Sequence, residues 1–188
     1  KRARNFAMNH RATGAGILGW HSYLQSNMIG FESEKAAQKN LEIAKTLRER
    51  THAASKEMSV DFGEPKILEG YGMRNTTTMA IAPTKSSSFI LGQVSQSIEP
   101  EFSNCYVKDL AKMKVTIKNP YLFELLEEKG QNTPDVWDSI KNRDGSVQHL
   151  SFLSQEEKEV FKTFSEINPS SIADQGAVPP GYFDQSQS

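Results

Sequence analysis

The sequence predicts a helix-rich α/β fold, and three observations carry this prediction. After Ser33, apolar residues recur every three or four positions through a long segment, as they do on one face of a helix. The β-prone run at 76–82 is stopped by Pro83 and followed by a polar turn and a short apolar stretch, which predicts a strand, a turn and a helix. Several later segments open on helix-capping residues.

Composition and charge exclude several classes of protein. The 188 residues carry 22 Lys and Arg against 23 Asp and Glu, so the net charge of -1 argues against a polybasic nucleic-acid binder. A single cysteine, Cys105, excludes an internal disulfide framework and a multi-cysteine metal site. No apolar run has the length that crosses a bilayer, so no membrane partner is expected.

The first part of the chain, 1–63, is predicted to be helical. Residues 5–28 are expected to form helix interrupted by glycines, and Ser33 is the predicted N-cap of a longer helix that ends at Gly63 and Pro65. The apolar stripe of this longer helix consists of Ala37, Leu41, Ala44, Leu47, Thr51, Ala54 and Met58.

The middle part, 64–108, is predicted to hold a loop at 64–75, the strand–turn–helix and an extended stretch at 97–108. The last part, 109–188, is predicted to be helical. Its four expected helices start at Pro120, at Pro134 after the cap Thr133, after Ser154 in a capping box, and at Pro169. The face of the third is expected to hold Val160, Phe161, Phe164 and Ile167, and Pro179-Pro180-Gly181 is expected to end the fourth.

The strand–turn–helix at 76–92 offers the most chemistry. A helix that starts after the carboxyl end of a strand presents unpaired N–H groups and a positive dipole end, which suit phosphate. Lys85 adds a cation, and Ser86, Ser87 and Ser88 add hydroxyl groups. On these residues alone, serines that simply cap the helix are the favoured interpretation.

The other patterns in the sequence give weaker indications of function. Gly14 to Gly19 matches G-x-G-x-x-G, but the residues before it are too polar for the buried strand of a dinucleotide fold, so close helix packing is the favoured use of these glycines. No two of the four histidines stand at the spacing of a helical metal site, and each is expected at the surface or in a cap. Cys105 is expected in the core, and Glu124, Glu127 and Glu128 on a solvated helix face.

Residues 74–88, Arg-Asn-Thr-Thr-Thr-Met-Ala-Ile-Ala-Pro-Thr-Lys-Ser-Ser-Ser, resemble the large (alpha) subunit of class I ribonucleotide reductase. The family pattern there is R-N-[ST]-T-x-x-A-x-x-P-[ST]-x-[ST]-[ST]-[SA], and the match continues through Gly92 to Ile98-Glu99-Pro100. Upstream, 5–16 with 18–21 is similar to a glycine-bearing family motif. Downstream, 184–188 is similar to the family's D-Q-S-x-S.

The resemblance implies a ten-stranded α/β barrel, of which this chain would supply much of the second half. It also implies that Pro83, Thr84, Lys85, Ser86 and Ser87 bind the substrate diphosphate, which reverses the preference for simple capping. The substrate would be a ribonucleoside diphosphate, reduced by radical chemistry to the deoxyribonucleotide.

The resemblance further implies partners that this segment lacks. The family's finger-loop motif N-x-C-x-E is not in the sequence and Cys105 matches none of the catalytic cysteines, so no residue here is expected to be catalytic and the chain is not expected to turn over alone. It would need the rest of the large subunit, a small subunit with a metal and radical centre, a dithiol reductant and nucleotide effectors. The start Lys1-Arg2-Ala3-Arg4, without Met or signal peptide, suggests a piece of a longer chain or one part of a split subunit, with the cytoplasm as the expected location.

Two alternatives remain on the residues alone. The chain could be a stand-alone helical module that docks a partner through the alanine-rich stripe at 37–58. It could also be a phosphate-binding structural domain without catalysis.

Overall fold

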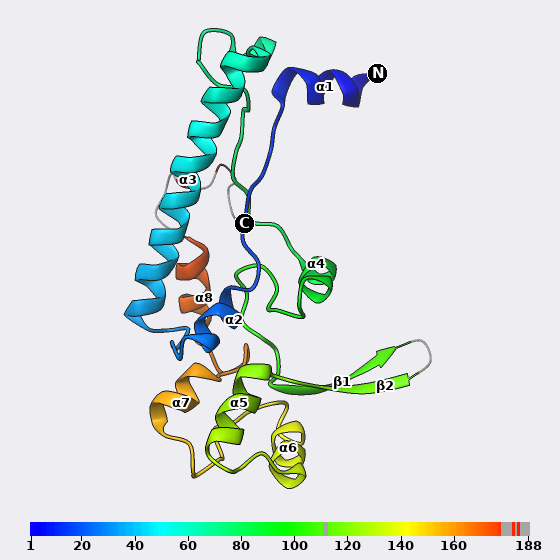
Figure 1. Cartoon of the computed structure of the whole chain (residues 1–188), viewed down its shortest axis with the longest axis vertical. Coiled ribbons are helices and arrows are strands. Elements are labelled where there is room, and N and C mark those ends of the chain that lie inside the picture. Colours follow the sequence, from blue (N-terminus) through cyan, green and yellow to red (C-terminus); the bar gives the residue numbers. More distant parts are fainter. Residues whose placement is uncertain (111–112, 178–181, 183, 185–188) are drawn as a thin grey trace. The chain divides into compact units, whose positions relative to one another are not determined.

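Helices make up most of the regular structure. A computed structural model describes residues 1–110, 113–177, 182 and 184, and Figure 1 shows its elements along the chain. The helices are α1 (Arg2–His10), α2 (Trp20–Ser26), α3 (Glu34–Phe62), the short 3-10 turn η1 (Lys66–Leu68), α4 (Lys85–Ile90), α5 (Pro120–Glu128), α6 (Pro134–Lys141), α7 (Gln155–Val160) and α8 (Pro169–Gly176). Within the described ranges, β1 (Cys105–Leu110) and β2 (Met113–Lys118) form the one regular sheet. The helix-rich character predicted from the sequence is confirmed.

The chain folds as two compact units. The first contains residues 1–17, 38–83 and 174–188, and the second contains 18–37 and 84–173. The division of the sequence into parts at 63/64 and 108/109 stays a prediction.

Two extended segments pair in the first unit. Ala15 and Met79 form a parallel β-bridge, in which the Ala15 N–H donates to the Thr78 carbonyl at 2.8 Å and the Ala80 N–H donates to the Ala15 carbonyl at 3.0 Å. The prediction of helix throughout 5–28 is therefore wrong for 11–19, which separates α1 from α2.

Glycine makes this pairing possible. A Cβ on Gly14 would lie 2.7 Å from the Cβ of Ala80, and a Cβ on Gly16 would overlap the Ala80 carbonyl oxygen. The glycines of the G-x-G-x-x-G pattern therefore do serve close packing, but against extended backbone and not against a helix. The predicted run at 76–82 is extended, with its bridge at Met79.

Helix α3 starts and ends where the sequence predicts. The Ser33 hydroxyl accepts the Ala36 N–H at 3.1 Å, and the helix ends at Phe62 before Gly63, whose φ of +73° suits glycine. The buried face differs from the predicted apolar stripe, because Ala37, Leu41 and Ala54 are exposed.

The face of α3 that is buried in the first unit is partly polar. The Ser55 hydroxyl accepts the backbone N–H of Arg74 at 3.2 Å and of Asn75 at 3.0 Å. The Asn40 side chain donates to the Gln175 carbonyl at 2.6 Å. Backbone groups need hydrogen-bond partners when they are buried, and these side chains supply them, Ser55 to the segment after η1 and Asn40 to the last turn of α8. An apolar periodicity alone does not reveal such a face.

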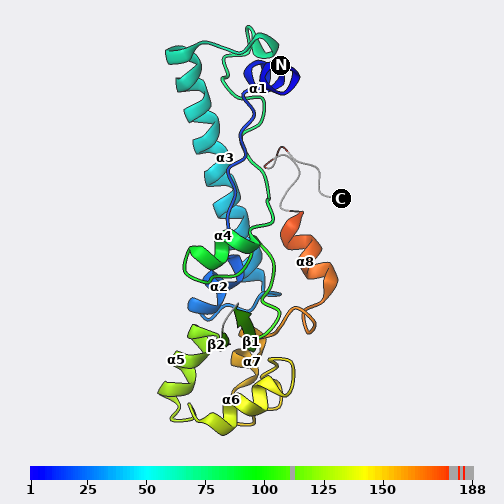
Figure 2. The same ribbon diagram turned by 90° about the vertical axis from the view of Figure 1, so that its right-hand side faces the viewer.

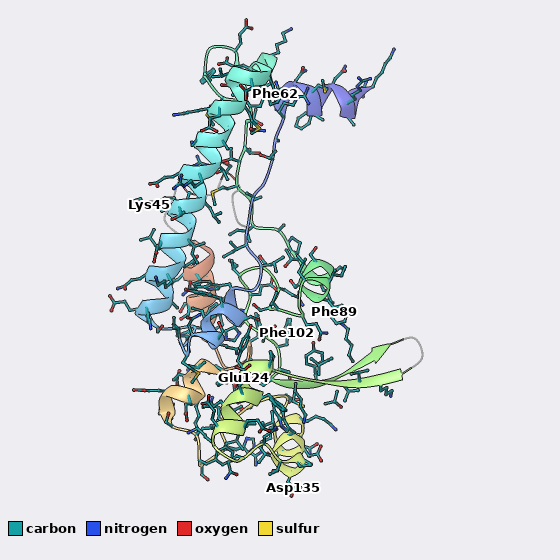
Figure 3. All side chains as sticks on the ribbon, in the orientation of Figure 1. Lys45, Phe62, Phe89, Phe102, Glu124 and Asp135 are labelled. Carbon is teal, nitrogen blue, oxygen red and sulfur yellow. The ribbon has the colours of Figure 1, made fainter. Side chains whose placement is uncertain are left out.

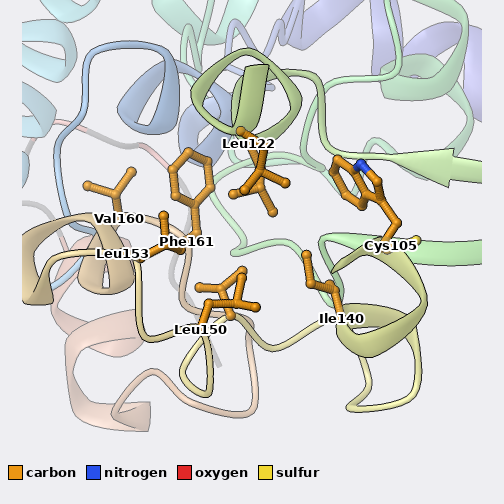
Figure 4. Close-up of a cluster of buried hydrophobic side chains, with 10 residues drawn as sticks. Cys105, Leu122, Ile140, Leu150, Leu153, Val160 and Phe161 are labelled. Atoms are coloured by element: carbon orange, nitrogen blue, oxygen red, sulfur yellow. The ribbon is translucent and has the colours of Figure 1, made fainter. Parts of the chain in front are cut away.

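The main hydrophobic core lies in the second unit, among α5, α6 and α7. Figure 2 shows these three helices grouped together, and Figure 4 shows the side chains between them. The cluster consists of Cys105, Leu122, Leu126, Trp137, Ile140, Val147, Leu150, Leu153, Val160 and Phe161. The predicted core position of Cys105 is confirmed, and burial raises the pKa of its thiol.

The helix starts around this core follow local capping rules. The Asn119 side chain accepts the N–H groups of Tyr121 and Leu122, with Pro120 as the first helical residue. Thr133 caps α6 in the same way, and Ser154 and Glu157 form the predicted capping box of α7. Helix α7 ends at Val160, so the prediction that Phe161, Phe164 and Ile167 lie on its face is wrong. The predicted end of α8 at Pro179–Gly181 lies outside the described residues.

The Ser154→Ala substitution is expected to lower the free energy of unfolding by about 1 kcal/mol, because it leaves the Glu157 N–H without its cap. Denaturant titration measures the change. Ser151→Ala is the matched control, since Ser151 is an exposed turn residue three positions earlier. Equal stability of the two variants would contradict the role given to the capping box.

The sheet is an antiparallel hairpin. Its register pairs Cys105 with Lys118 and Val107 with Thr116, and in Figure 1 it projects away from α5 and α6. β1 begins in the predicted extended stretch 97–108 but runs on to Leu110, and β2 lies in the part expected to be helical, so that expectation is wrong for 109–110 and 113–118. No helix in the described part of the chain combines the length and the apolar character needed to cross a membrane.

Candidate functional site

Helix α4 begins immediately after Pro83 and Thr84, where the sequence predicts the phosphate-binding turn. Thr84 stands at the N-cap position, but its hydroxyl does not cap the helix. The Thr84 Oγ1 instead accepts the Ser97 N–H at 2.7 Å and is bonded to the Ser88 Oγ at 2.8 Å. The Ser88 hydroxyl donates in turn to the Thr84 carbonyl at 2.8 Å. The Thr84 hydroxyl, which could have capped the first turn of α4, is therefore engaged in other hydrogen bonds.

The first turn of α4 is consequently open. The first bond within the helix runs from the Ser88 N–H to the Thr84 carbonyl at 2.8 Å, so helical geometry gives the N–H groups of Lys85, Ser86 and Ser87 no acceptor inside the helix. The side chains of these three residues are exposed. Pro83 is also exposed and is the last residue of the first unit, joined to Thr84 by the chain. The five predicted site residues thus follow one another into an uncapped helix start.

A cavity of about 490 Å³ lies between α4 and β1 in the second unit. Lys85, Ser88 and Phe89 line it from α4, and the segment 101–103 together with 106–108 lines it from the other side. The Lys108 ammonium lies 3.3 Å from the centre of the Phe89 ring, a cation–π contact across this cavity. Figure 3 shows Phe89 on α4. Of the five predicted residues, Lys85 is the one that reaches this cavity.

Glu101 stands in the wall of this cavity. It also lines a smaller neighbouring cavity of about 220 Å³, together with Gln93, Ser103 and Tyr106, which both cavities share. Burial raises the pKa of Glu101 to about 7. Burial, and then the nearby Glu101, also raise the pKa of Tyr106. A carboxyl group that titrates near neutral pH in a cavity wall can both accept and donate a hydrogen bond.

His21 fixes the backbone at Glu101. Its Nδ1 accepts the Glu101 N–H at 2.8 Å, and the imidazole is fully buried in the second unit. Burial lowers the pKa of His21 to about 4, so the ring is neutral at physiological pH and available as an acceptor. The expectation that each histidine lies at the surface or in a cap is wrong for His21.

Sequence reasoning missed Glu101, Tyr106 and Lys108. Glu101 directly follows the Ile98-Glu99-Pro100 motif, in the middle of a stretch that was predicted to be extended. An acidic residue inside such a stretch was the available signal. Nothing in the local sequence places Glu101 in the same cavity wall as Lys85, because the fold and not the local chain brings the two residues to this cavity.

A second polar cluster lies in the first unit, around Asp184. Its carboxylate accepts the N–H groups of Thr78 at 2.7 Å and of Met79 at 3.1 Å, and pairs with the Arg48 guanidinium. The Asp184 of the D-Q-S-x-S motif therefore ties the end of the chain to the extended run at 76–82 and to α3. Residues 185–188 of that motif lie outside the described residues.

The described residues hold no group of three or more His, Cys, Asp or Glu side chains arranged to bind a metal ion. The acidic residues Glu124, Glu127 and Glu128 lie on the exposed face of α5, as predicted.

Comparisons with known proteins agree over the full chain. The family model described as "Ribonucleotide reductase, barrel domain" matches residues 1–67 and 64–188. The ribonucleoside-diphosphate reductase large subunits of Invertebrate iridescent virus 6 and Invertebrate iridescent virus 3 are 40% and 42% identical to the chain over alignments of 191 residues. Each alignment covers 100% of this chain, but only 20% of the first viral protein and 30% of the second.

Among solved structures, the Actinobacillus ureae class Id ribonucleotide reductase alpha subunit is similar, with a TM-score of 0.91 and 58% sequence identity. The match covers 99% of this chain and 34% of that one. The chain thus spans about a fifth to a third of the length of these relatives.

Proposed function

The chain belongs to the ribonucleotide reductase barrel-domain family, and from this premise we propose that it works as part of the large subunit of a ribonucleoside-diphosphate reductase. The reaction replaces the ribose 2′-hydroxyl of a ribonucleoside diphosphate with hydrogen and supplies deoxyribonucleotides for DNA synthesis. The match of the whole chain to large subunits supports this assignment.

In this proposal the chain supplies much of the second half of a ten-stranded α/β barrel. The parallel bridge between Ala15 and Met79 supports it, because parallel pairing of segments far apart in the sequence is the pattern of α/β barrels. The connection between them includes α3, the long helix expected in a parallel crossover.

The proposed role of the turn at the start of α4 is to bind the substrate diphosphate. The turn consists of Pro83, Thr84, Lys85, Ser86 and Ser87. The observation that carries this assignment is the uncapped first turn of α4, whose three N–H groups have no acceptor in the helix. A diphosphate offers several anionic oxygens, and preorganised N–H donors at the positive end of a helix suit them. Lys85 adds a positive charge. Pro83 restricts the direction in which the chain enters the turn.

These residues bind and orient; none of them is assigned a chemical step. Fixing the diphosphate places the ribose at a defined distance from the reacting centre, and positioning of this kind contributes several kcal/mol to catalysis. The radical and the reducing thiols would come from the remainder of the large subunit, a small subunit and a dithiol reductant, with nucleotide effectors as regulators. The proposal includes a cytoplasmic location for the enzyme.

The Ser87→Asp substitution tests the site. In the full-length protein it is expected to weaken CDP binding at least about tenfold, since a new carboxylate would face the diphosphate. Ser87→Ala keeps the backbone N–H and is expected to stay within about threefold of wild type, because the loss of one exposed hydroxyl bond costs little. Equilibrium dialysis with labelled CDP measures both.

Ser170→Asp is the matched control, because Ser170 is likewise an exposed serine in the first turn of a helix, α8. It is expected to leave CDP affinity unchanged. Equal affinity of the Ser87→Asp and Ser170→Asp variants would contradict the diphosphate site while leaving the family assignment intact.

A further inference from the structure

The cavity between α4 and β1 supports an inference that does not depend on the proposed function. We propose that this cavity binds a small aromatic anion, with Lys108 as the partner of its negative group and Glu101 as a hydrogen-bonding residue in the wall. The ligand class is a planar ring that carries a carboxylate, sulfonate or phosphate group.

The size and lining of the cavity fit such a ligand. Its volume of about 490 Å³ lies within the range of small-molecule sites, roughly 300–1,000 Å³. Three aromatic side chains, Phe89, Phe102 and Tyr106, line it, and each is partly exposed. Figure 3 shows Phe89 and Phe102 at this part of the second unit. Aromatic rings offer flat apolar area for a second ring at little entropic cost.

The charge of the lining favours an anion. Lys85 and Lys108 both line the cavity, and neither forms a salt bridge with any described carboxylate. The contact with the Phe89 ring holds the Lys108 ammonium at the cavity at 3.3 Å from the ring centre. An ammonium that is held in place, and that no described carboxylate neutralises, suits an anionic group.

Glu101 adds dependence on pH. Its carboxyl group is partly buried, and burial alone raises its pKa to about 7. The titratable groups that share a cavity lining with it are Lys85 on α4, Tyr106 and Lys108 on β1, and Lys118 in the smaller cavity, and the neutral His21 accepts the Glu101 N–H. Below about pH 7 the neutral carboxyl donates a hydrogen bond to an anion, and above it the carboxylate repels one.

This cavity is distinct from the proposed diphosphate turn. Ser86 and Ser87 do not line it, and Lys85 is the one residue common to both. The variants chosen for the test therefore leave Lys85 to Ser87 unchanged.

The test uses the full-length protein and naphthalene sulfonate, a fluorescent aromatic anion that stays ionised throughout the pH range. Wild type is expected to bind one equivalent at this cavity. Lys108→Met keeps the length of the side chain and removes its charge, so it is expected to weaken binding about tenfold. Lys114→Met is the matched control, since Lys114 is exposed on β2 and does not line the cavity.

Glu101→Gln supplies an independent readout. Wild type is expected to bind about fivefold more tightly at about pH 6 than at about pH 8, and Glu101→Gln is expected to abolish this dependence. Loss of the pH dependence supports the site even where Lys108→Met is poorly folded. The proposal fails if naphthalene sulfonate does not bind, if Lys108→Met and Lys114→Met bind alike, or if Glu101→Gln retains the wild-type pH profile.

Discussion

The Gly16→Ala substitution is expected to destabilise the first unit by about 3 kcal/mol, since an added methyl group would overlap backbone that cannot move aside. The overlap is with the carbonyl oxygen of Ala80, in the segment that pairs with Ala15. A flexible side chain could rotate out of the way, whereas a carbonyl held in an extended strand could yield only if the strands separate. The variant is therefore expected to break the bridge between Ala15 and Met79.

Amide hydrogen exchange in the full-length protein measures this effect. The N–H groups of Ala15 and Ala80 both donate across the pair, so both are expected to exchange faster in the variant. Gly30→Ala is the matched control, because a Cβ at Gly30 meets its nearest atoms, in Glu159, at an ordinary 3.6 Å. Unchanged exchange at Ala15 and Ala80 in the Gly16→Ala variant would show that the pairing tolerates the methyl group.

The Asp184→Asn substitution is expected to cost about 2 to 3 kcal/mol at neutral pH, because it removes the charge from several hydrogen bonds at once. The Asp184 carboxylate accepts two backbone N–H groups, from Thr78 and Met79, and pairs with Arg48. Both N–H groups donate to Oδ2 and the Arg48 guanidinium pairs with Oδ1. An asparagine that keeps its oxygen toward the two N–H groups therefore presents its NH₂ group to the guanidinium and leaves that donor without an acceptor.

The pH dependence of this effect has a definite sign. Burial by itself would raise the pKa of Asp184, but the Thr78 N–H and the Arg48 guanidinium outweigh it and hold the pKa below its usual 3.8. A carboxyl whose pKa falls on folding stabilises the folded state above its unfolded-state pKa, and this contribution is lost as the pH falls through the folded-state pKa. The difference between wild type and Asp184→Asn should therefore be largest near neutral pH and should shrink as the pH falls below 3.8 and through the folded-state pKa.

His52 gives a second readout of the same cluster. Burial and then Arg48 lower the pKa of His52, while Asp184 opposes them. In the Asp184→Asn variant the opposing charge is gone, so the pKa of His52 is expected to fall further in an NMR titration. Asp174→Asn, at an exposed position on α8, is the control for both stability and titration. A His52 pKa that does not move in Asp184→Asn would place the two residues out of electrostatic contact.

The β1–β2 hairpin shows a signal that was present in the sequence. Met113, Val115 and Ile117 alternate with Lys114, Thr116 and Lys118, the period of a strand with one apolar face. The neighbouring stretch 97–108 was predicted as extended, and β2 completes it as an antiparallel partner. The wrong prediction for the buried face of α3 has no such signal. Its stripe is apolar in sequence, and yet the helix buries Asn40 and Ser55.

The candidate site was predictable in position and not in detail. The motif at 74–88 located the turn, and Lys85, Ser86 and Ser87 are exposed at a helix start, whereas Ser88 is buried. Whether the helix end is capped or open depends on Thr84, whose hydroxyl is bonded to the Ser97 N–H, 13 residues further on. The pKa of Glu101 likewise follows from burial that no local pattern reports.

The amino-acid sequence by itself determined where α5, α6 and α7 begin and which family the motifs resemble. Each of those helix starts rests on a side chain and an N–H two or three positions apart, such as Ser154 and Glu157, so neighbours in the chain are sufficient. Only the tertiary structure decided that 11–19 is extended, which face of α3 is buried and that Glu101 stands across a cavity from Lys85. Extended backbone, burial and cavities all require partners from distant parts of the chain, and these partners meet only once the chain has folded.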